Sequence, residues 1–282
     1  MIAAFPPRET ALHLVIALIL ISALACRDSG ASSNEPTGRS EGGSASDRTL
    51  APTGEVVIAR PSQPYAAISV VDGGSVTGTV SLAMPLTPAP SVPTGPDSAL
   101  CGSSIPDESV GPPGSVSGGV VVWLDDIRRG KPVPLERRLE LESSRCRLSP
   151  RVQAGVVASA VNVIGHDRFR QHLRFLTAGE KAPRAAVLLG QDEQVIPTEL
   201  PLEAPGLVIV RDTDHAWPTA YLAVFDHPYF AVTAPNGTFT IDGIPPGKYT
   251  VMAWHERAKR AEQVVAVSSG GTAHMSIALQ PR

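Results

Sequence analysis

The sequence predicts an all-β protein. Charged residues make up only 18% of the 282 residues, and 25 Gly and 27 Pro interrupt the chain at short intervals, which is typical of turn-rich proteins with little helix. Beyond the N-terminal segment, no window of about 11 to 18 residues has a helical hydrophobic period. Short runs rich in β-branched and aromatic residues lie instead between Gly, Pro and Asn turns. A chain of this length can hold one or two domains with their own cores.

Residues 1–26 predict a targeting segment. The apolar stretch from Leu12 to Ile21 is too short for a spanning helix and ends in small residues, as in a secretory signal. Cys26 then resembles the lipidated cysteine of a bacterial lipobox, although Ala23 stands where that motif usually has Leu. We expect Cys26 to carry a lipid that attaches the protein to a membrane. Simple secretion after Ala25 and an uncleaved signal anchor are the alternatives.

Residues 27–64 predict a disordered tether. Their Ser, Gly, Asn, Glu, Pro and Thr content cannot bury enough apolar surface to offset the entropy of ordering. Arg27 places no acidic residue next to the lipidated position. The resemblance to bacterial lipoproteins therefore implies an outer-membrane protein that faces the periplasm or the cell surface, with a soluble periplasmic protein as the alternative. The net charge of −3 gives no reason to expect nucleic acid as a partner.

The cysteine count predicts one disulfide. Assigning Cys26 to lipid leaves Cys101 and Cys146, an even pair in an oxidising compartment. In the chain-entropy model, closing a loop of this size contributes about 4 kcal/mol. Two free buried thiols are the alternative.

Strand patterns follow the tether. Residues 68–71 and 75–82 read as strands around the turn at Asp72–Gly74. The strongest apolar run of the folded part spans residues 119–124 and predicts a central strand buried on both faces. Residues 139–142 alternate between leucine and glutamate, as expected of a half-exposed or edge strand.

The stretch from Tyr221 to Glu256 is the densest block of strand signals. Asn236–Gly237 predicts a hairpin turn with two positive-φ positions. Thr238–Ile241 then alternates as a half-buried strand, and Pro245–Gly247 separates it from the next strand, Tyr249–Trp254.

Residues 236–256, NGTFTIDGIPPGKYTVMAWHE, resemble the carboxypeptidase regulatory-like (transthyretin-like) β-sandwich module, with its Gly-x-Phe strand, Pro-Gly turn and Tyr strand. Residues 206–256 resemble the tail of exported bacterial proteins in which a cupredoxin-like segment precedes such a module. The resemblance implies a cupredoxin-like β region at residues 65–220, followed by or merged with a regulatory-like module at residues 221–282. Merging requires the early VTGTV strand, residues 76–80, to pair with the C-terminal module.

The resemblance also implies a former copper corner. His215 and Trp217 match the His and Trp of that family's ligand loop, and His172 matches the upstream His. Asp212 stands where the family has its thiolate, and Pro218 where it has its Met. A blue-copper site needs the soft sulfur ligands, so we do not expect an electron carrier.

Three corner residues remain candidate metal ligands. His172, His215 and Asp212 form a two-His, one-carboxylate set that suits zinc, copper(II) or iron. The other interpretation is a decayed site of ordinary polar residues. We expect no cofactor, with copper or zinc as the alternative.

Other chemical signals are weaker. We expect His227 to cap a strand by bonding a carbonyl. His255–Glu256 lacks the second His of a zinc-hydrolase motif, because position 259 is Lys, and these two polar residues are expected near the surface. Trp123 and Trp254 are expected in the core.

The sequence contains neither a G-x-S-x-G nucleophile elbow nor a phosphate-binding loop. We therefore predict a non-enzymatic exported protein, a β-sandwich module that binds carbohydrate or a partner protein. Its contacts are expected from an exposed Trp217 and from loops that include residues 84–96. A metal-binding or redox protein using His172 and His215, and an accessory domain of an extracytoplasmic enzyme complex, are the alternatives.

Overall fold

The computed structural model describes residue 58 and residues 63–110, 119–180, 182–191, 194–198 and 202–282. Strands dominate these residues, so the predicted all-β class is confirmed. The signal segment, Cys26 and almost all of the tether lie outside the described residues. None of the described helices is long and apolar enough to span a bilayer.

Two larger sheets form one β-sandwich, which we call the inserted sandwich. Its four-stranded sheet has the order β13 (Gln194–Thr198), β10 (Ala160–Gly165), β7 (Arg138–Ser144) and β8 (Arg147–Ser149). Its five-stranded sheet has the order β12 (Ala185–Leu189), β11 (Gln171–Thr177), β14 (Gly206–Asp212), β15 (Thr219–Phe225) and β9 (Val152–Val156). Apolar side chains of both sheets, among them Leu141, Val163, Leu173 and Leu222, form one buried cluster.

A second pair of sheets forms what we call the host sandwich. Its four-stranded sheet has the order β16 (Phe230–Val232), β5 (Val121–Asp125), β18 (Gly247–Trp254) and β19 (Ala261–Val267). Its three-stranded sheet has the order β17 (Thr238–Ile244), β2 (Gly74–Leu82) and β20 (Thr272–Leu279). Val76, Leu124, Phe239 and Ile277 belong to the cluster buried between them.

Short elements complete the fold. β1 (Ala66–Ala67) pairs with β6 (Arg129–Gly130). β3 (Val92–Pro93) pairs with β4 (Ser104–Ile105), and between them lie the 3-10 helix η1 (Gly95–Asp97) and the short helix α1 (Ser98–Cys101).

A third apolar cluster joins the two sandwiches. Successive side chains of β5 and of β15 point alternately into two different apolar clusters. In β5, Leu124 points into the host sandwich while Trp123 joins the third cluster. In β15, Leu222 belongs to the inserted sandwich while Tyr221 and Phe225 join the third cluster. Because both faces of these strands are buried, their sequences are continuous apolar runs. The predicted central strand at residues 119–124 is confirmed.

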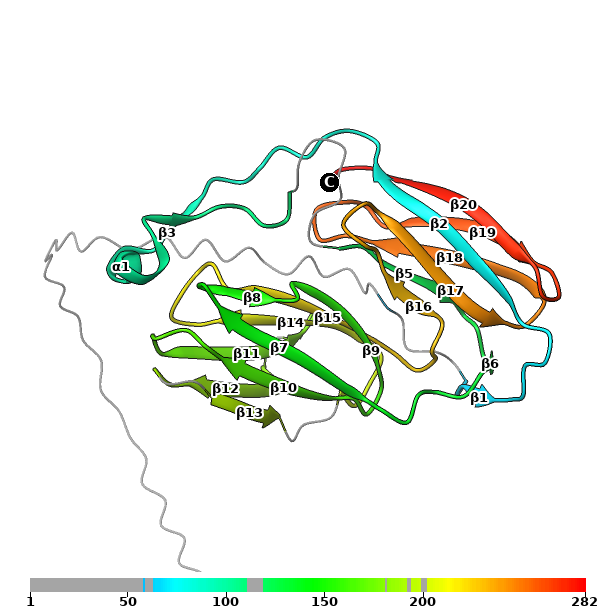
Figure 1. The fold of residues 1–282 in the computed structure, drawn as a ribbon, viewed down its shortest axis with the longest axis horizontal. Coiled ribbons are helices and arrows are strands. Elements are labelled where there is room, and N and C mark those ends of the chain that lie inside the picture. The colour runs from blue at the N-terminus through cyan, green and yellow to red at the C-terminus, as the bar shows by residue number, and fades with distance from the viewer. Residues whose placement is uncertain (1–57, 59–62, 111–118, 181, 192–193, 199–201) are drawn as a thin grey trace, which may run out of the picture. The chain divides into compact units, whose positions relative to one another are not determined.

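The sheets do not follow the expected division between residues 220 and 221. β2 lies between β17 and β20, parallel to β20 and antiparallel to β17, as Figure 1 shows with β2 in cyan beside the orange and red strands. β5 likewise pairs with β16 and β18. Residues 138–225 therefore lie in sequence between β5 and β16 of the host sandwich. The early VTGTV strand pairs with the C-terminal strands, so the merged arrangement is the one observed.

Two local expectations are wrong. Residues 68–71 are irregular rather than a strand. Ile68 still donates its N–H to Gly130 O of β6 at 2.7 Å, but the chain then leaves β6, and Val71 is 92% exposed. Asn236–Gly237 does not close a hairpin between paired strands, since β16 and β17 lie in different sheets. Only Gly237 there has positive φ, at 82°. Asn236 Oδ1 instead accepts hydrogen bonds from the backbone N–H and the hydroxyl of Thr238.

Candidate functional site

The predicted metal residues meet at one corner of the inserted sandwich. His172 lies in β11, Asp212 ends β14, and His215 lies in the turn before β15. His215 Nδ1 lies 2.5 Å from Asp212 Oδ2. The backbone N–H groups of His172 and Asp214 donate to Asp212 Oδ1 at 2.9 and 3.1 Å. Asp212 is buried and joins these segments through its two oxygens.

The two imidazoles of this corner face different carboxylates. His172 Nδ1 is bonded to Asp214. His215 Nε2 lies 3.2 Å from Asp97 Oδ2, so both ring nitrogens of His215 contact carboxylates. Within the described part of the chain, no group of three or more His, Cys, Asp or Glu residues is arranged to hold a metal ion. The three predicted ligands are brought together, and Asp212 connects the two histidines.

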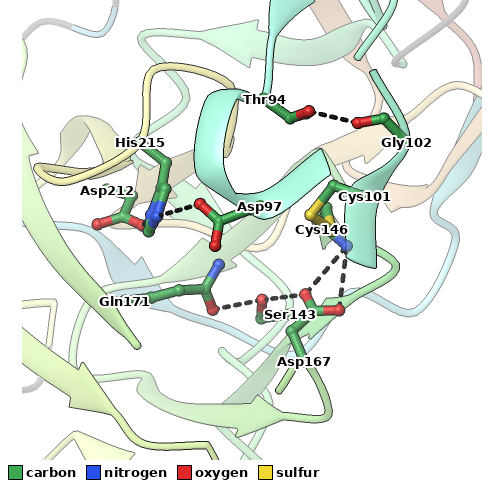
Figure 2. Close-up of a disulfide and its surroundings, with 10 residues drawn as sticks. All are labelled: Thr94, Asp97, Cys101, Gly102, Ser143, Cys146, Asp167, Gln171, Asp212 and His215. Carbon is green, nitrogen blue, oxygen red and sulfur yellow. Dashed lines mark hydrogen bonds and ion pairs between the residues drawn. A yellow bond between two sulfur atoms is a disulfide. The ribbon is translucent and has the colours of Figure 1, made fainter. Parts of the chain in front are cut away.

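Asp97 comes from a segment that covers this corner. We call residues 92–105, comprising β3, η1, α1 and β4, the cap. The predicted disulfide is present: Cys101 of the cap is bonded to Cys146, with a Cα–Cα distance of 5.7 Å (Figure 2). Ile105 of the cap packs with Cys146, Phe169 and Trp217 in a small apolar cluster between the cap and the inserted sandwich.

Trp217 was expected to be exposed, and this expectation is wrong. Its exposed fraction is 9%, and its ring centroid lies 4.9 Å from that of His215. The cap buries it, and the spacing of residues along the chain gives no sign that the cap folds over this loop. Trp217 is therefore not a surface contact in this structure. Trp123 and Trp254 are core residues as predicted, 2% and 3% exposed.

Polar groups line the floor beneath the cap. Figure 2 shows Gln171 and Ser143 side by side, with the Ser143 hydroxyl 2.6 Å from Gln171 Oε1 and 2.9 Å from Asp167 Oδ2. Asp167 accepts the backbone N–H of Cys146 at 3.0 Å. Neither Gln171 Nε2 nor Trp217 Nε1 has a hydrogen-bond partner among the described residues, and both atoms are buried.

A charged network beside the cap was not predicted from the sequence. Arg151 Nε donates to Glu256 Oε1 and Arg151 Nη2 donates to Glu256 Oε2, both at 2.8 Å. The residue directly before β9 is thereby bonded to the turn after β18. Glu108 lies 3.2 Å from Arg147 and 3.7 Å from Arg151. Burial raises the pKa of Glu108, while the two arginines lower it. Glu256 was expected near the surface, but its side chain is only 9% exposed.

A second ion pair holds the segment that follows the cap. Arg257 Nη1 lies 2.7 Å from Asp107 Oδ2 and donates to Ser109 Oγ at 3.0 Å. Burial raises the pKa of Asp107, but hydrogen bonds from Ser109 and Ala89, together with Arg257, outweigh it and lower the pKa to about 2. Asp107 is therefore a charged anchor between the host sandwich and this segment.

The remaining buried histidines bond the backbone. His227 Nδ1 accepts the N–H of Tyr229 at 3.2 Å, and His255 Nδ1 accepts the N–H of Arg257 at 3.2 Å. Burial, with a smaller effect of Arg128, lowers the pKa of His227 to about 4. The expected carbonyl contact is also indicated, because a backbone hydrogen bond with Leu124 favours the protonated imidazole of His227 and raises its pKa. Both imidazoles organise turns at strand ends.

An open groove of about 880 Å³ is lined mainly by the three-stranded sheet of the host sandwich, with Ala231, Val232, Ala234 and Gln263 contributed by β16, the segment after it and β19. Thr77 and Thr79 of β2 point away from the core, because they alternate with the buried Val76 and Val80. Neighbouring strands add hydroxyls and an imidazole, and no Asp, Glu, Lys or Arg lines the groove among the described residues. The polar residues from these neighbouring strands are Thr238, Thr240, His274 and Ser276.

Comparisons with known proteins match parts of the chain. Residues 206–280 match the model of the carboxypeptidase regulatory-like domain. This match begins with β14 and β15 of the inserted sandwich and continues through the C-terminal strands of the host sandwich. No curated protein sequence matches the chain.

Two solved structures are similar to about a third of the chain. One is the copper-containing nitrite reductase from Thermus scotoductus SA-01, with 15% identity over 36% of this chain and 24% of the reductase, and a TM-score of 0.27. The other is a methionine-to-alanine mutant of amicyanin with Cu(I), with 14% identity over 33% of this chain and 96% of amicyanin, and a TM-score of 0.26. This chain thus spans about a quarter of the reductase. At these values the likeness gives no information about copper in this protein.

Proposed function

We propose that this chain is an exported, non-enzymatic binding protein that holds an uncharged carbohydrate in the groove over β17, β2 and β20. The observation that carries this proposal is the lining of the groove, which is rich in Thr and Ser hydroxyls and has no formally charged carboxylate, ammonium or guanidinium group among the described residues. Burying a charged ligand against such a surface would leave its charge without a partner, at a high desolvation cost.

Hydroxyl side chains suit a ligand that carries hydroxyls itself. Each Thr or Ser oxygen both donates and accepts hydrogen bonds, as sugar hydroxyls do. Pairs across neighbouring strands hold these groups in place: Thr77 Oγ1 lies 3.4 Å from Thr240 Oγ1, and Thr79 Oγ1 lies 3.4 Å from Ser276 Oγ. The rotamers of such β-branched residues are restricted, so little side-chain freedom is lost when a ligand binds.

The sheet beneath the groove is rigid. Val76, Phe239 and Ile277 on its inner face belong to the core of the host sandwich. A rigid support keeps the hydroxyls at fixed spacing, which favours binding by reducing the entropy lost on association.

Export and membrane attachment complete the proposal. The apolar segment from Leu12 to Ile21 and the following Cys26 support secretion and lipid attachment. The disulfide between Cys101 and Cys146 supports an oxidising compartment, because such bonds are rare in the cytosol. A lipid at Cys26 and the tether would display the groove at the outer membrane, on its periplasmic side or at the cell surface.

Retention on insoluble polysaccharides tests the proposal. Chitin, cellulose and peptidoglycan are incubated with the secreted chain and with the triple variant Thr77→Val, Thr79→Val, Thr240→Val. Valine keeps the shape and strand propensity of Thr but removes the hydroxyl. We expect at least one polymer to retain the native chain, and the triple variant to bind about tenfold more weakly or worse, since each lost hydrogen bond costs about 0.5–1.5 kcal/mol.

A matched control separates the groove from its surroundings. Thr272→Val removes a hydroxyl from the same sheet, where Thr272 pairs with Ser75 at 2.9 Å outside the groove. This variant should bind as the native chain does. Equal retention of the native chain and the triple variant would refute the groove as the binding site. Capture of a protein partner with no retention on any of the polymers would show that the ligand class is wrong.

A further inference from the structure

We propose that the Cys101–Cys146 disulfide is a reducible latch, and that its cleavage releases the cap and uncovers the aromatic corner around Trp217. This inference is independent of the groove proposed above. It rests on how the cap is attached, on what lies beneath it, and on the separate anchor of the segment that follows it.

The disulfide is the main attachment of the cap. Neither η1 nor α1 contains a buried residue, and Leu100 is 55% exposed. Thr94 and Ile105 are the fully buried residues of the cap, and Val92 and Cys101 are partly buried against the apolar cluster of the corner. This small cluster offsets only part of the entropy of keeping the cap docked, so we infer that the covalent bond contributes most of the restraint.

The cap holds its own shape. β3 pairs with β4, the N–H of Thr94 donates to Ser103 O at 3.2 Å, and the N–H of Gly102 donates to Ser98 O at 3.0 Å. Its remaining polar attachment to the corner is Asp97, 3.2 Å from His215 Nε2. Because most of its hydrogen bonds are internal, the cap can leave the corner without breaking the strand pairing of the inserted sandwich. Once it has lost its packing against the corner, its two-residue strands and four-residue helix fray, because elements this short are not stable alone, and their amides then exchange.

The chain beyond the cap has anchors of its own. Asp107 and Ser109 are bonded to Arg257, and Glu108 to Arg147 and Arg151, and none of these contacts involves the disulfide, so we expect them to persist when the latch opens. The movement is thereby limited to the cap, and the strands of the inserted sandwich keep their partners.

Opening the latch changes the surface of the corner. Phe169, Trp217 and His215 form a contiguous aromatic group, with ring centroids 4.9 Å apart in each neighbouring pair. In the same corner, Gln171 Nε2 and Trp217 Nε1 are buried donors without partners among the described residues. Buried donors of this kind are costly, and release of the cap lets water or a ligand satisfy them.

The chemical step is thiol–disulfide exchange with a dithiol reductant. A thiolate of the reductant attacks one sulfur of the bond, the S–S bond breaks, and a mixed disulfide forms while the other cysteine leaves as a thiolate. The second thiol of the reductant then displaces the protein, so both cysteines take up protons and the dithiol is oxidised to its own disulfide. Cys101 is the more accessible sulfur, because it is half-buried while Cys146 is 2% exposed.

Hydrogen exchange of the native chain, with and without dithiothreitol, tests the latch. Reduction should speed exchange of the amides of Thr94 and Gly102 at least tenfold. The amides of β11 and β14 should change less than twofold. Acrylamide should quench tryptophan emission more strongly in the reduced chain, and Trp217→Phe should abolish this increase, because Trp123 and Trp254 stay in the core. Oxidised glutathione should restore the original values.

The variant Cys101→Ser provides a second route to the open form without a reductant. It should exchange and quench as the reduced native chain does. Unchanged protection of Thr94 and Gly102 in both forms would overturn the proposal, because the cap would then be docked without its bond. Loss of protection across β11 and β14 would also overturn it, since the disulfide would then hold the whole sandwich together rather than the cap.

Discussion

Replacing Arg151 by Met should destabilise the fold through the charges that it leaves behind. The Arg151 side chain is 16% exposed and neutralises Glu256, which is 9% exposed, and Glu108, which is 17% exposed. Met fills much of the same volume and leaves the packing against Tyr221 largely intact. The carboxylates lose their bidentate partner, however, and Arg147 reaches only Glu108.

The expected loss is about 3–5 kcal/mol of unfolding free energy, the usual cost of removing one partner from a buried ion pair. Urea unfolding of the disulfide-intact chain, followed by tryptophan emission, measures this difference. The double variant Arg151→Met, Glu256→Met removes the charge of Glu256 as well, and should recover at least half of the loss. Arg184→Met is the matched control: its partner Glu180, 3.2 Å away, is 46% exposed, so the loss there should stay below about 1 kcal/mol.

The stability difference between the Arg151→Met variant and the native chain should also depend on pH. Burial already raises the pKa of Glu108 above its ordinary value, and without Arg151 this pKa rises further, because the charged form loses a favourable partner. A carboxyl of this kind destabilises the fold at high pH, and the deficit shrinks as pH falls through the raised pKa. The gap between the variant and the native chain should therefore be smaller at about pH 5 than at about pH 8. A loss equal to that of Arg184→Met, or a gap that widens on acidification, would refute the reasoning.

Three further predictions concern other parts of the chain. Gly237→Ala should cost about 2 kcal/mol or more in urea unfolding, because φ there is +82° and a Cβ would lie 2.2 Å from the carbonyl oxygen of Val80; a stability equal to that of the native chain would contradict the reported turn. The pKa of His227 falls from 6.5 to about 4 on folding, so the native chain should lose about 3 kcal/mol as pH drops between these values, at about 1.4 kcal/mol per pH unit. His227→Asn, whose side-chain oxygen can still accept the N–H of Tyr229, should flatten that pH dependence, and an unchanged slope would assign it to another group. Mass spectrometry of membrane-extracted protein should find a lipid-modified Cys26 at the N-terminus, and an unmodified Cys26 would favour simple secretion.

Local patterns in the sequence predicted strands and some of their burial. The apolar run at residues 119–124 indicated a strand buried on both faces, and β5 has Val122 in one core and Trp123 in another. The pairing of Cys101 with Cys146 followed from the cysteine count. The strand patterns depend only on residues that are close in sequence, so they predict strands correctly even when the packing of distant segments is unknown.

Partners distant in sequence were harder to predict. The alternation of β2 fixes which side chains point inward, but it is the same whichever strands lie beside it. The burial of Trp217 depends on a cap more than 100 residues earlier in the chain. Arg151 and Glu256 are likewise brought together by the packing of the two sandwiches. In the sequence, a single charged residue beside a strand gives no indication that it has a buried partner. Ile68–Val71 has strand-forming residues, but only Ile68 is bonded to the short strand β6 before the chain turns away, so propensity alone was misleading there.

The pairing of β2 with β20 has a consequence for biogenesis. The first long strand of the host sandwich, β2, needs a neighbour, β20, that lies far along the chain: Ser75 and Thr272, which face each other in this pair, are 197 positions apart. The inserted sandwich, by contrast, has all its strands once Phe225 has emerged. During synthesis the middle of the chain can therefore finish folding first, while β2 lacks its partner until β20 has been made.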